Sequence, residues 1–118
     1  MSRAEVIKKA FIIVAAVLSF TLSDSSRANY SAAQPNGATL FRDKCAICHG
    51  KDGRGLQNWR SKGQPDLASP KWQKSRTDAQ IAEAIKEGKG RFMPAWKNKL
   101  SDEEINALVK HTRALVKK

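Results

Sequence analysis

Residues 45–49, Cys45-Ala46-Ile47-Cys48-His49, form a CxxCH pentapeptide in a chain of 118 residues. Two thiols three positions apart at the end of a helix lie on nearly the same face. Each can add to a vinyl group to form a thioether, and the adjacent imidazole can then reach an iron. The pentapeptide therefore predicts one haem c, bound covalently through Cys45 and Cys48, with His49 as the proximal ligand.

Three other roles for this pentapeptide agree less well with the rest of the chain. A redox-active CxxC pair needs a βαβ context, and no segment has the pattern of a strand. A structural zinc site needs four ligands, and after residue 33 the chain adds only His111 to these Cys and His residues. A disulfide between residues so close in sequence closes a very small loop and stabilises little.

Met93 is the candidate for the second axial position. It is the one methionine after residue 33, and it lies in the loop sequence Gly90-Arg91-Phe92-Met93-Pro94. A lone methionine is more often core filler, but Pro94 keeps Met93 extended and out of helical geometry. Thioether ligation raises the reduction potential. His111 is the alternative ligand, although its place in the last helical pattern favours a packing or surface role.

The remaining pattern is helical and predicts an all-α fold of about three to four helices around one haem. Residues 37–44 are expected to form a short helix that leads into the pentapeptide. Thr77 begins a capping box that predicts a helix over about 78–87, with Gly88 as the stop. Residues 51–65 carry three glycines and a proline and are expected to form a loop.

A second capping box begins at Ser101, with Leu100 and Ile105 as its hydrophobic staple, and predicts a last helix that ends near Val116. Seven apolar residues are expected to keep water from the haem: Phe41, Leu67, Ile81, Ile85, Phe92, Leu100 and Leu108. The three tryptophans are expected to be packing residues, one of which can donate a hydrogen bond to a haem propionate: Trp59, Trp72 and Trp96.

The first 33 residues have the layout of a secretory signal peptide. Basic residues come first, residues 10–22 are uncharged, and small polar residues follow. This apolar stretch is shorter than the roughly 20 residues of a spanning helix, so an uncleaved membrane anchor is the weaker alternative. We expect cleavage after Ala33, or alternatively after Ala28, which leaves residues 34–118 as one exported, periplasmic domain.

The chain is strongly basic, with 22 Lys and Arg against 11 Asp and Glu. Four of these basic and two of these acidic residues lie before position 34, so the exported part keeps a formal charge of about +9. Export argues against a nucleic-acid partner. The positive charge then favours acidic proteins or anionic membrane surfaces as partners.

These residues resemble the class I c-type cytochromes over nearly the whole exported part of the chain. The CxxCH segment and the Met93-Pro94 pair come in the order typical of that family. Gly37 and Phe41 are similar to the glycine and aromatic of the family's N-terminal helix, which pack against its C-terminal helix. His111 stands where many members have an aromatic residue.

The resemblance implies a cytochrome c-like fold, and electron transfer rather than enzymatic catalysis. His49 and Met93 would fill both axial positions and leave no open site for a substrate or for oxygen. Residues 65–67, Pro-Asp-Leu, resemble the loop in which a proline carbonyl accepts the ring N–H of the proximal histidine. The resemblance therefore gives Pro65 that role.

Five basic residues surround the predicted methionine loop and are expected to dock an acidic patch on a redox partner: Lys86, Lys89, Arg91, Lys97 and Lys99. We expect a monomeric electron carrier between respiratory or dehydrogenase complexes, anchored to a membrane only if the signal segment is retained. One alternative is a haem-bearing subunit of a larger dehydrogenase or oxidase complex. Another is a haem-based gas sensor, which requires Met93 to leave the iron readily.

Overall fold

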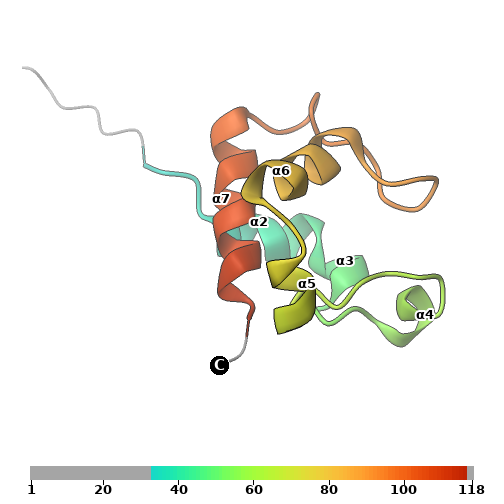
Figure 1. Ribbon diagram of the computed structural model, residues 1–118. Coiled ribbons are helices and arrows are strands. Elements are labelled where there is room, and N and C mark those ends of the chain that lie inside the picture. Colours follow the sequence, from blue (N-terminus) through green and yellow to red (C-terminus); the bar gives the residue numbers. More distant parts are fainter. Residues whose placement is uncertain (1–32, 117–118) are drawn as a thin grey trace, which may run out of the picture. The chain divides into compact units, whose positions relative to one another are not determined.

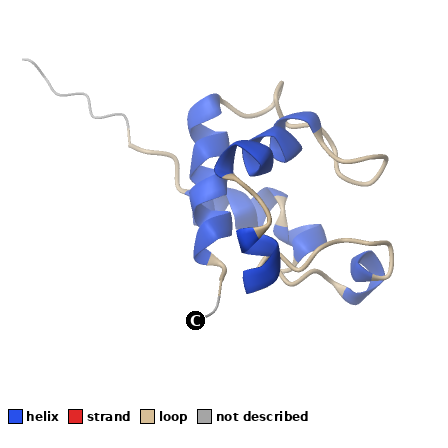
Figure 2. Ribbon diagram, viewed as in Figure 1, coloured by secondary structure: helices blue, strands red, loops and turns tan. Residues whose placement is uncertain are grey.

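The computed structural model describes residues 33–116 (Figure 1). Except for Ala33, the predicted signal peptide lies outside this part of the chain. The described part contains six helices: α2 (Gly37–Lys44), α3 (Ala46–His49), α4 (Gln57–Arg60), α5 (Pro70–Lys74), α6 (Asp78–Glu87) and α7 (Asp102–Ala114). Residues 33–116 form no strand, only an isolated bridge between Lys89 and Met93, which confirms the all-α prediction (Figure 2).

The three longest helices match the predicted ones because their ends are determined locally. In α6 the Gln80 backbone N–H donates to Thr77 Oγ1 at 3.2 Å, and the Gln80 side chain accepts from the Thr77 backbone N–H at 3.0 Å. Ser101 and Glu104 form the same reciprocal pair at the start of α7. Each box satisfies two N–H groups that a helix leaves without partners. Helix α7 ends two residues before the predicted Val116.

Helix α2 crosses the terminal helix α7 at close range. A Cβ at Gly37 would overlap the Ala107 carbonyl oxygen, so only glycine permits this approach. One α-helical turn later, Phe41 is buried, and the centroid of its ring lies 4.9 Å from that of the His111 ring on α7. The expected packing of Gly37 and Phe41 on the C-terminal helix is confirmed.

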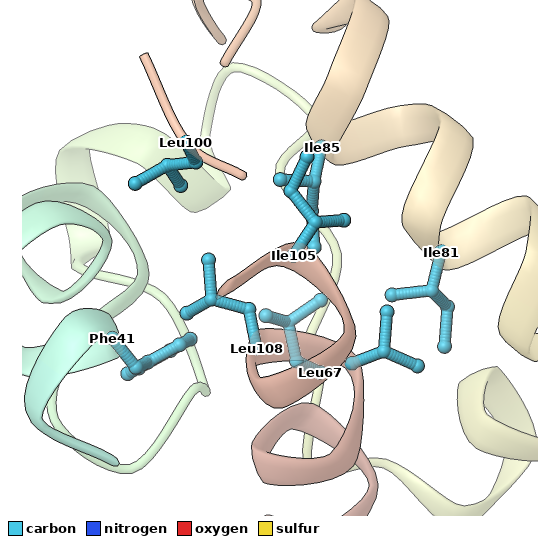
Figure 3. Close-up of a cluster of buried hydrophobic side chains, with 8 residues drawn as sticks. Phe41, Leu67, Ile81, Ile85, Leu100, Ile105 and Leu108 are labelled. Atoms are coloured by element: carbon cyan, nitrogen blue, oxygen red, sulfur yellow. The ribbon is translucent and has the colours of Figure 1, made fainter. Parts of the chain in front are cut away.

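The core lies where α2 and α6 pack against α7 (Figure 3). Ile105 and Leu108 of α7 are its most buried side chains, each 1% exposed. Figure 3 shows Leu108 facing Phe41, and Ile105 beside Ile85. The buried apolar cluster consists of Phe41, Leu67, Ile81, Ile85, Leu100, Ile105, Leu108 and Val109. Six of the seven residues expected to keep water from the haem are in it.

Helices α4 and α5 were not predicted. Helix α4 interrupts residues 51–65, which were expected to be a loop throughout. At four and five residues, the two helices are too short to show an apolar period. Helix α5 does carry a start signal in the sequence. Ser69 accepts a hydrogen bond from the Trp72 N–H as the N-cap, and Pro70 occupies the first turn.

A buried polar network joins α5 to α7. The Gln73 amide nitrogen donates to the carbonyls of Leu67 and Thr112, both at 2.7 Å. Arg113 donates to the Gln73 carbonyl oxygen at 2.7 Å and to its side-chain oxygen at 2.9 Å. The same guanidinium pairs with Asp78 of α6 at 2.7 Å. One arginine of α7 therefore fixes two other helices against it.

Between residues 33 and 116, every helix is too short or too polar to cross a bilayer.

Candidate haem site

The pentapeptide occupies the end of α2 and all of α3. Cys45 is the C-cap of α2, and its carbonyl accepts hydrogen bonds from Cys48 N–H at 3.1 Å and His49 N–H at 2.9 Å. These hydrogen bonds place the three residues within a single helical turn, as the spacing predicted. Both thiols are half-buried, and neither is in a disulfide.

Burial determines the protonation of two of these groups. It raises the pKa of the Cys45 thiol to about 11 and lowers the pKa of His49 below its ordinary value. His49 therefore stays neutral near neutral pH, which is the form whose ring nitrogen can bind a metal. The centroid of its ring lies 6.3 Å from that of the Phe41 ring, at the edge of the core.

One ring nitrogen of His49 has no partner. Nδ1 is buried and makes no hydrogen bond within residues 33–116. Pro65 is exposed on the loop after α4, and its carbonyl does not accept the His49 N–H in this structure. A buried polar atom without a partner is costly, so the imidazole is poised to gain an interaction. The role of Pro65 stays a prediction.

Met93 sits at the base of a tight loop between α6 and α7. Its backbone N–H donates to the Lys89 carbonyl at 3.2 Å, and its carbonyl accepts from the Lys89 N–H at 3.0 Å. Gly88, with φ +74°, leads into this loop, where a Cβ would overlap the Met93 carbonyl oxygen. The Met93 side chain is half-buried and packs against the core cluster.

The return of the loop is held by the end of α6. Trp96 N–H donates to the carbonyls of Ile85 and Lys86, both at 3.1 Å, so the segment after Pro94 is fixed to a core helix. Figure 1 shows this loop and the α3–α4 segment extending to the same side of α7. Sequence reasoning singled out Met93, but it missed the contact with Gly88 that places it.

Phe92, expected to help keep water from the haem, lies outside the buried apolar cluster. Its side chain is 45% exposed at the tip of the loop, where it meets the ring of Trp59. Trp72 and Trp96 pack against the core, as expected for packing residues. Apolar character alone did not distinguish a loop tip from a core position.

The basic residues near the methionine loop differ in their pairing. Lys86 pairs with Asp102 at 2.6 Å, and Lys97 pairs with Glu87 at 2.8 Å. Lys89, Arg91 and Lys99 make no ion pair within residues 33–116. Three of the five predicted docking cations therefore have no acidic partner among the described residues and can face a partner protein.

The donor set fits haem c. Two unlinked thiols and a neutral histidine lie on one short turn, and a half-buried thioether lies in a loop fixed to the core. His111, the alternative ligand, instead packs on Phe41 in the crossing of α2 and α7. An all-α fold with this donor set defines a c-type cytochrome domain.

Comparisons with known proteins agree with this class. The family described as "Cytochrome C oxidase, cbb3-type, subunit III" matches residues 32–111. The chain therefore belongs to the family of cbb3-type cytochrome c oxidase subunit III. This membership confirms the predicted cofactor, haem c attached through Cys45 and Cys48, and a general role in electron transfer.

Two curated relatives are oxidase subunits. The CcoP subunit of a cbb3-type cytochrome c oxidase from Cereibacter sphaeroides is 29% identical over 102 residues, which cover 86% of this chain and 34% of that protein. The FixP subunit from Rhizobium etli is 39% identical over 79 residues, which cover 67% of this chain and 26% of that protein. The chain thus matches about a third or less of the length of these relatives.

A solved structure is similar over its whole length. The c-type cytochrome KustC0563 superposes with a TM-score of 0.66 at 35% identity, and the match covers 70% of this chain and 99% of that one. A mutant of the same cytochrome gives a TM-score of 0.63. The expected class I fold is confirmed.

Proposed function

We propose that this chain carries single electrons on a haem c whose iron is held by His49 and Met93, as the haem-bearing part of a cbb3-type oxidase. The observation that carries this proposal is the loop geometry, in which Met93 is pinned to Lys89 and, through Trp96, to α6. The family membership and the CcoP and FixP relatives support the assignment to an oxidase.

The residues of the site then have distinct tasks. Bound haem c supplies a one-electron couple, which gives or accepts an electron without breaking a bond. His49, kept neutral by burial, offers a ring nitrogen to the iron, and Met93 offers a sulfur that favours the reduced state. With His49 and Met93 both on the iron, oxygen and other small ligands could bind only after Met93 leaves, which argues against the gas-sensor alternative.

Optical spectra of the haem-loaded protein test the ligand set. We expect a thioether-to-iron charge-transfer band in the oxidised form and only slow carbon monoxide binding to the reduced form, limited by the release of Met93. Met93→Ala should remove the band, admit carbon monoxide and lower the reduction potential. His111→Phe is the matched control and should leave the band unchanged. A wild-type protein that lacks the band, or that binds carbon monoxide as fast as Met93→Ala, would overturn the proposal.

A free periplasmic carrier is the second candidate. It is favoured by the solved cytochrome, of which this chain covers 99%, and by the basic residues available to a soluble partner. Fractionation of the native host separates the two candidates. Co-purification with a terminal oxidase in the membrane fraction supports the subunit, whereas recovery of the cytochrome alone in the periplasmic fraction supports the carrier.

A further inference from the structure

Two loops of the domain meet at their outer ends. The rings of Trp59, on α4, and Phe92, at the tip of the methionine loop, lie edge to face with centroids 5.9 Å apart and planes inclined by 72°. Lys62 Nζ lies 4.6 Å from the centroid of the Trp59 ring and 5.2 Å from that of Phe92. We call Trp59, Lys62 and Phe92 the clasp.

One side of the clasp is tied to the haem-attachment segment. The backbone N–H of Gly55 donates to the His49 carbonyl at 2.7 Å, and that of Leu56 donates to the Cys48 carbonyl at 3.2 Å. Helix α4 follows at once, and the Trp59 N–H donates to the Leu56 carbonyl at 2.9 Å. The Trp59 ring is therefore placed relative to His49 through a short series of backbone hydrogen bonds.

The other side of the clasp is the residue before Met93. The bridge between Lys89 and Met93 holds the base of the loop, but it leaves the tip unsupported. Gly90 has open space around it, and Arg91 and Phe92 are exposed. Within residues 33–116, the aromatic and cation–π contacts that Phe92 receives from outside its own loop come from Trp59 and Lys62.

We propose that Trp59 is a positioning residue for Met93, acting through Phe92. By joining the tip of the methionine loop to the segment that follows His49, the clasp restrains the loop opening that releases the Met93 sulfur from the iron. Lys62 strengthens the contact because its charge faces both rings. The proposal rests on Met93 being the sixth ligand, as proposed above.

The test measures how readily Met93 leaves the iron in the haem-loaded full chain. Trp59→Ala should speed carbon monoxide binding to the reduced protein about two- to tenfold, because the loss of one aromatic pair raises the open population by that factor. The thioether charge-transfer band of the oxidised form should also vanish at a lower temperature, before helix is lost by circular dichroism. Phe92→Ala, at an exposed position, should give the same two changes.

Three controls separate positioning from general destabilisation. Trp59→Phe keeps an aromatic edge and should restore both readouts toward wild type. Val109→Ala removes buried volume from the core of α7; it should lower thermal stability without changing the carbon monoxide rate. The double variant Trp59→Ala/Phe92→Ala should behave like either single variant if the pair acts as one unit.

The outcomes distinguish this proposal from the ligand assignment. A wild-type protein without the thioether band overturns Met93 ligation, and the role of Trp59 is overturned with it. A wild-type band together with unchanged rates in Trp59→Ala and Phe92→Ala overturns the clasp alone. Additive effects in the double variant also overturn it, because the two rings would then act separately.

Discussion

Single atoms decide where the sixth-ligand candidate lies. Gly88 has φ +74° and ψ −177°, a backbone conformation that is essentially confined to glycine. The missing side chain also leaves room for the Met93 carbonyl. The position of the thioether therefore depends on a hydrogen atom five residues earlier in the chain.

Gly88→Ala should both strain the backbone and displace Met93. We expect a loss of about 1–3 kcal/mol in the free energy of unfolding, together with a weaker thioether charge-transfer band. Urea titration and optical spectra of the oxidised protein measure the two effects. Gly90→Ala, in the same loop but with open space around it, should lose less stability and keep the band. Equal spectra for both variants would show that Gly88 does not place Met93.

Among the helices, α5 matters more than its five residues suggest. The side-chain amide of Gln73 donates hydrogen bonds to the carbonyls of Leu67 and Thr112. Its oxygen accepts one from Arg113 of α7. Sequence reasoning did not assign this glutamine a role, because a polar residue in a short helix has the pattern of a surface position.

Gln73→Met keeps the volume but removes every side-chain hydrogen bond. Two carbonyls and part of a guanidinium then lose their partner in a buried place. We expect a loss of about 1–3 kcal/mol in the free energy of unfolding, measured by urea titration. Gln34→Met changes an exposed glutamine before α2 and should be nearly neutral. A neutral Gln73→Met would mean that water replaces these bonds at no cost.

The crossing of α2 and α7 introduces a pH dependence. Burial lowers the pKa of His111 below its ordinary value of 6.5, so the unfolded chain binds a proton more readily than the folded one. The contribution of His111 to stability is therefore complete above that value and is lost as the pH falls through the lower pKa of the folded state. Below both values the protonated imidazole would lie against the Phe41 ring.

His111→Phe should remove this dependence while keeping an aromatic ring on Phe41. Melting temperatures of the wild type should fall between about pH 7.5 and about pH 5.5, and those of the variant should fall less. His111→Gln is the matched control, since it removes the titration without adding an aromatic ring. An unchanged slope in both variants would assign the acid sensitivity to other groups.

Much of the architecture was predictable because its determinants are local. The capping boxes at Thr77 and Ser101 gave helix starts that the structure reproduces. The clasp and the contact of Gly88 with Met93 were not predictable, since each depends on how separate segments meet in space. Phe92 illustrates the limit: its neighbour Met93 packs on the core, while its own side chain points away to Trp59.

At the scale of the whole domain, charge is the property that a partner meets first. The chain has twice as many basic as acidic residues. Lys89, Arg91 and Lys99, which make no ion pair within residues 33–116, concentrate this charge near the methionine loop. Exposed opposite charges steer association most strongly at low salt.

Arg91→Gln should slow electron exchange with an acidic partner about two- to fivefold at low ionic strength, and the difference should shrink as salt is added. Lys71→Gln, on the exposed surface of α5, is the matched control and should change the rate little. Stopped-flow kinetics over a series of salt concentrations measure both variants. A rate independent of salt in the wild type would show that the basic surface does not steer docking.

The close crossing of α2 and α7 also has a consequence for biogenesis. Cys45 is the C-cap of α2, so the attachment segment directly continues a helix that packs on α7. Helix α7 is synthesised after every other described helix. Because the chain is synthesised from its N-terminus, Phe41 cannot be buried, and Cys45 cannot be covered, before α7 has been made. Both thiols should therefore stay accessible to haem for most of the time that the chain takes to emerge.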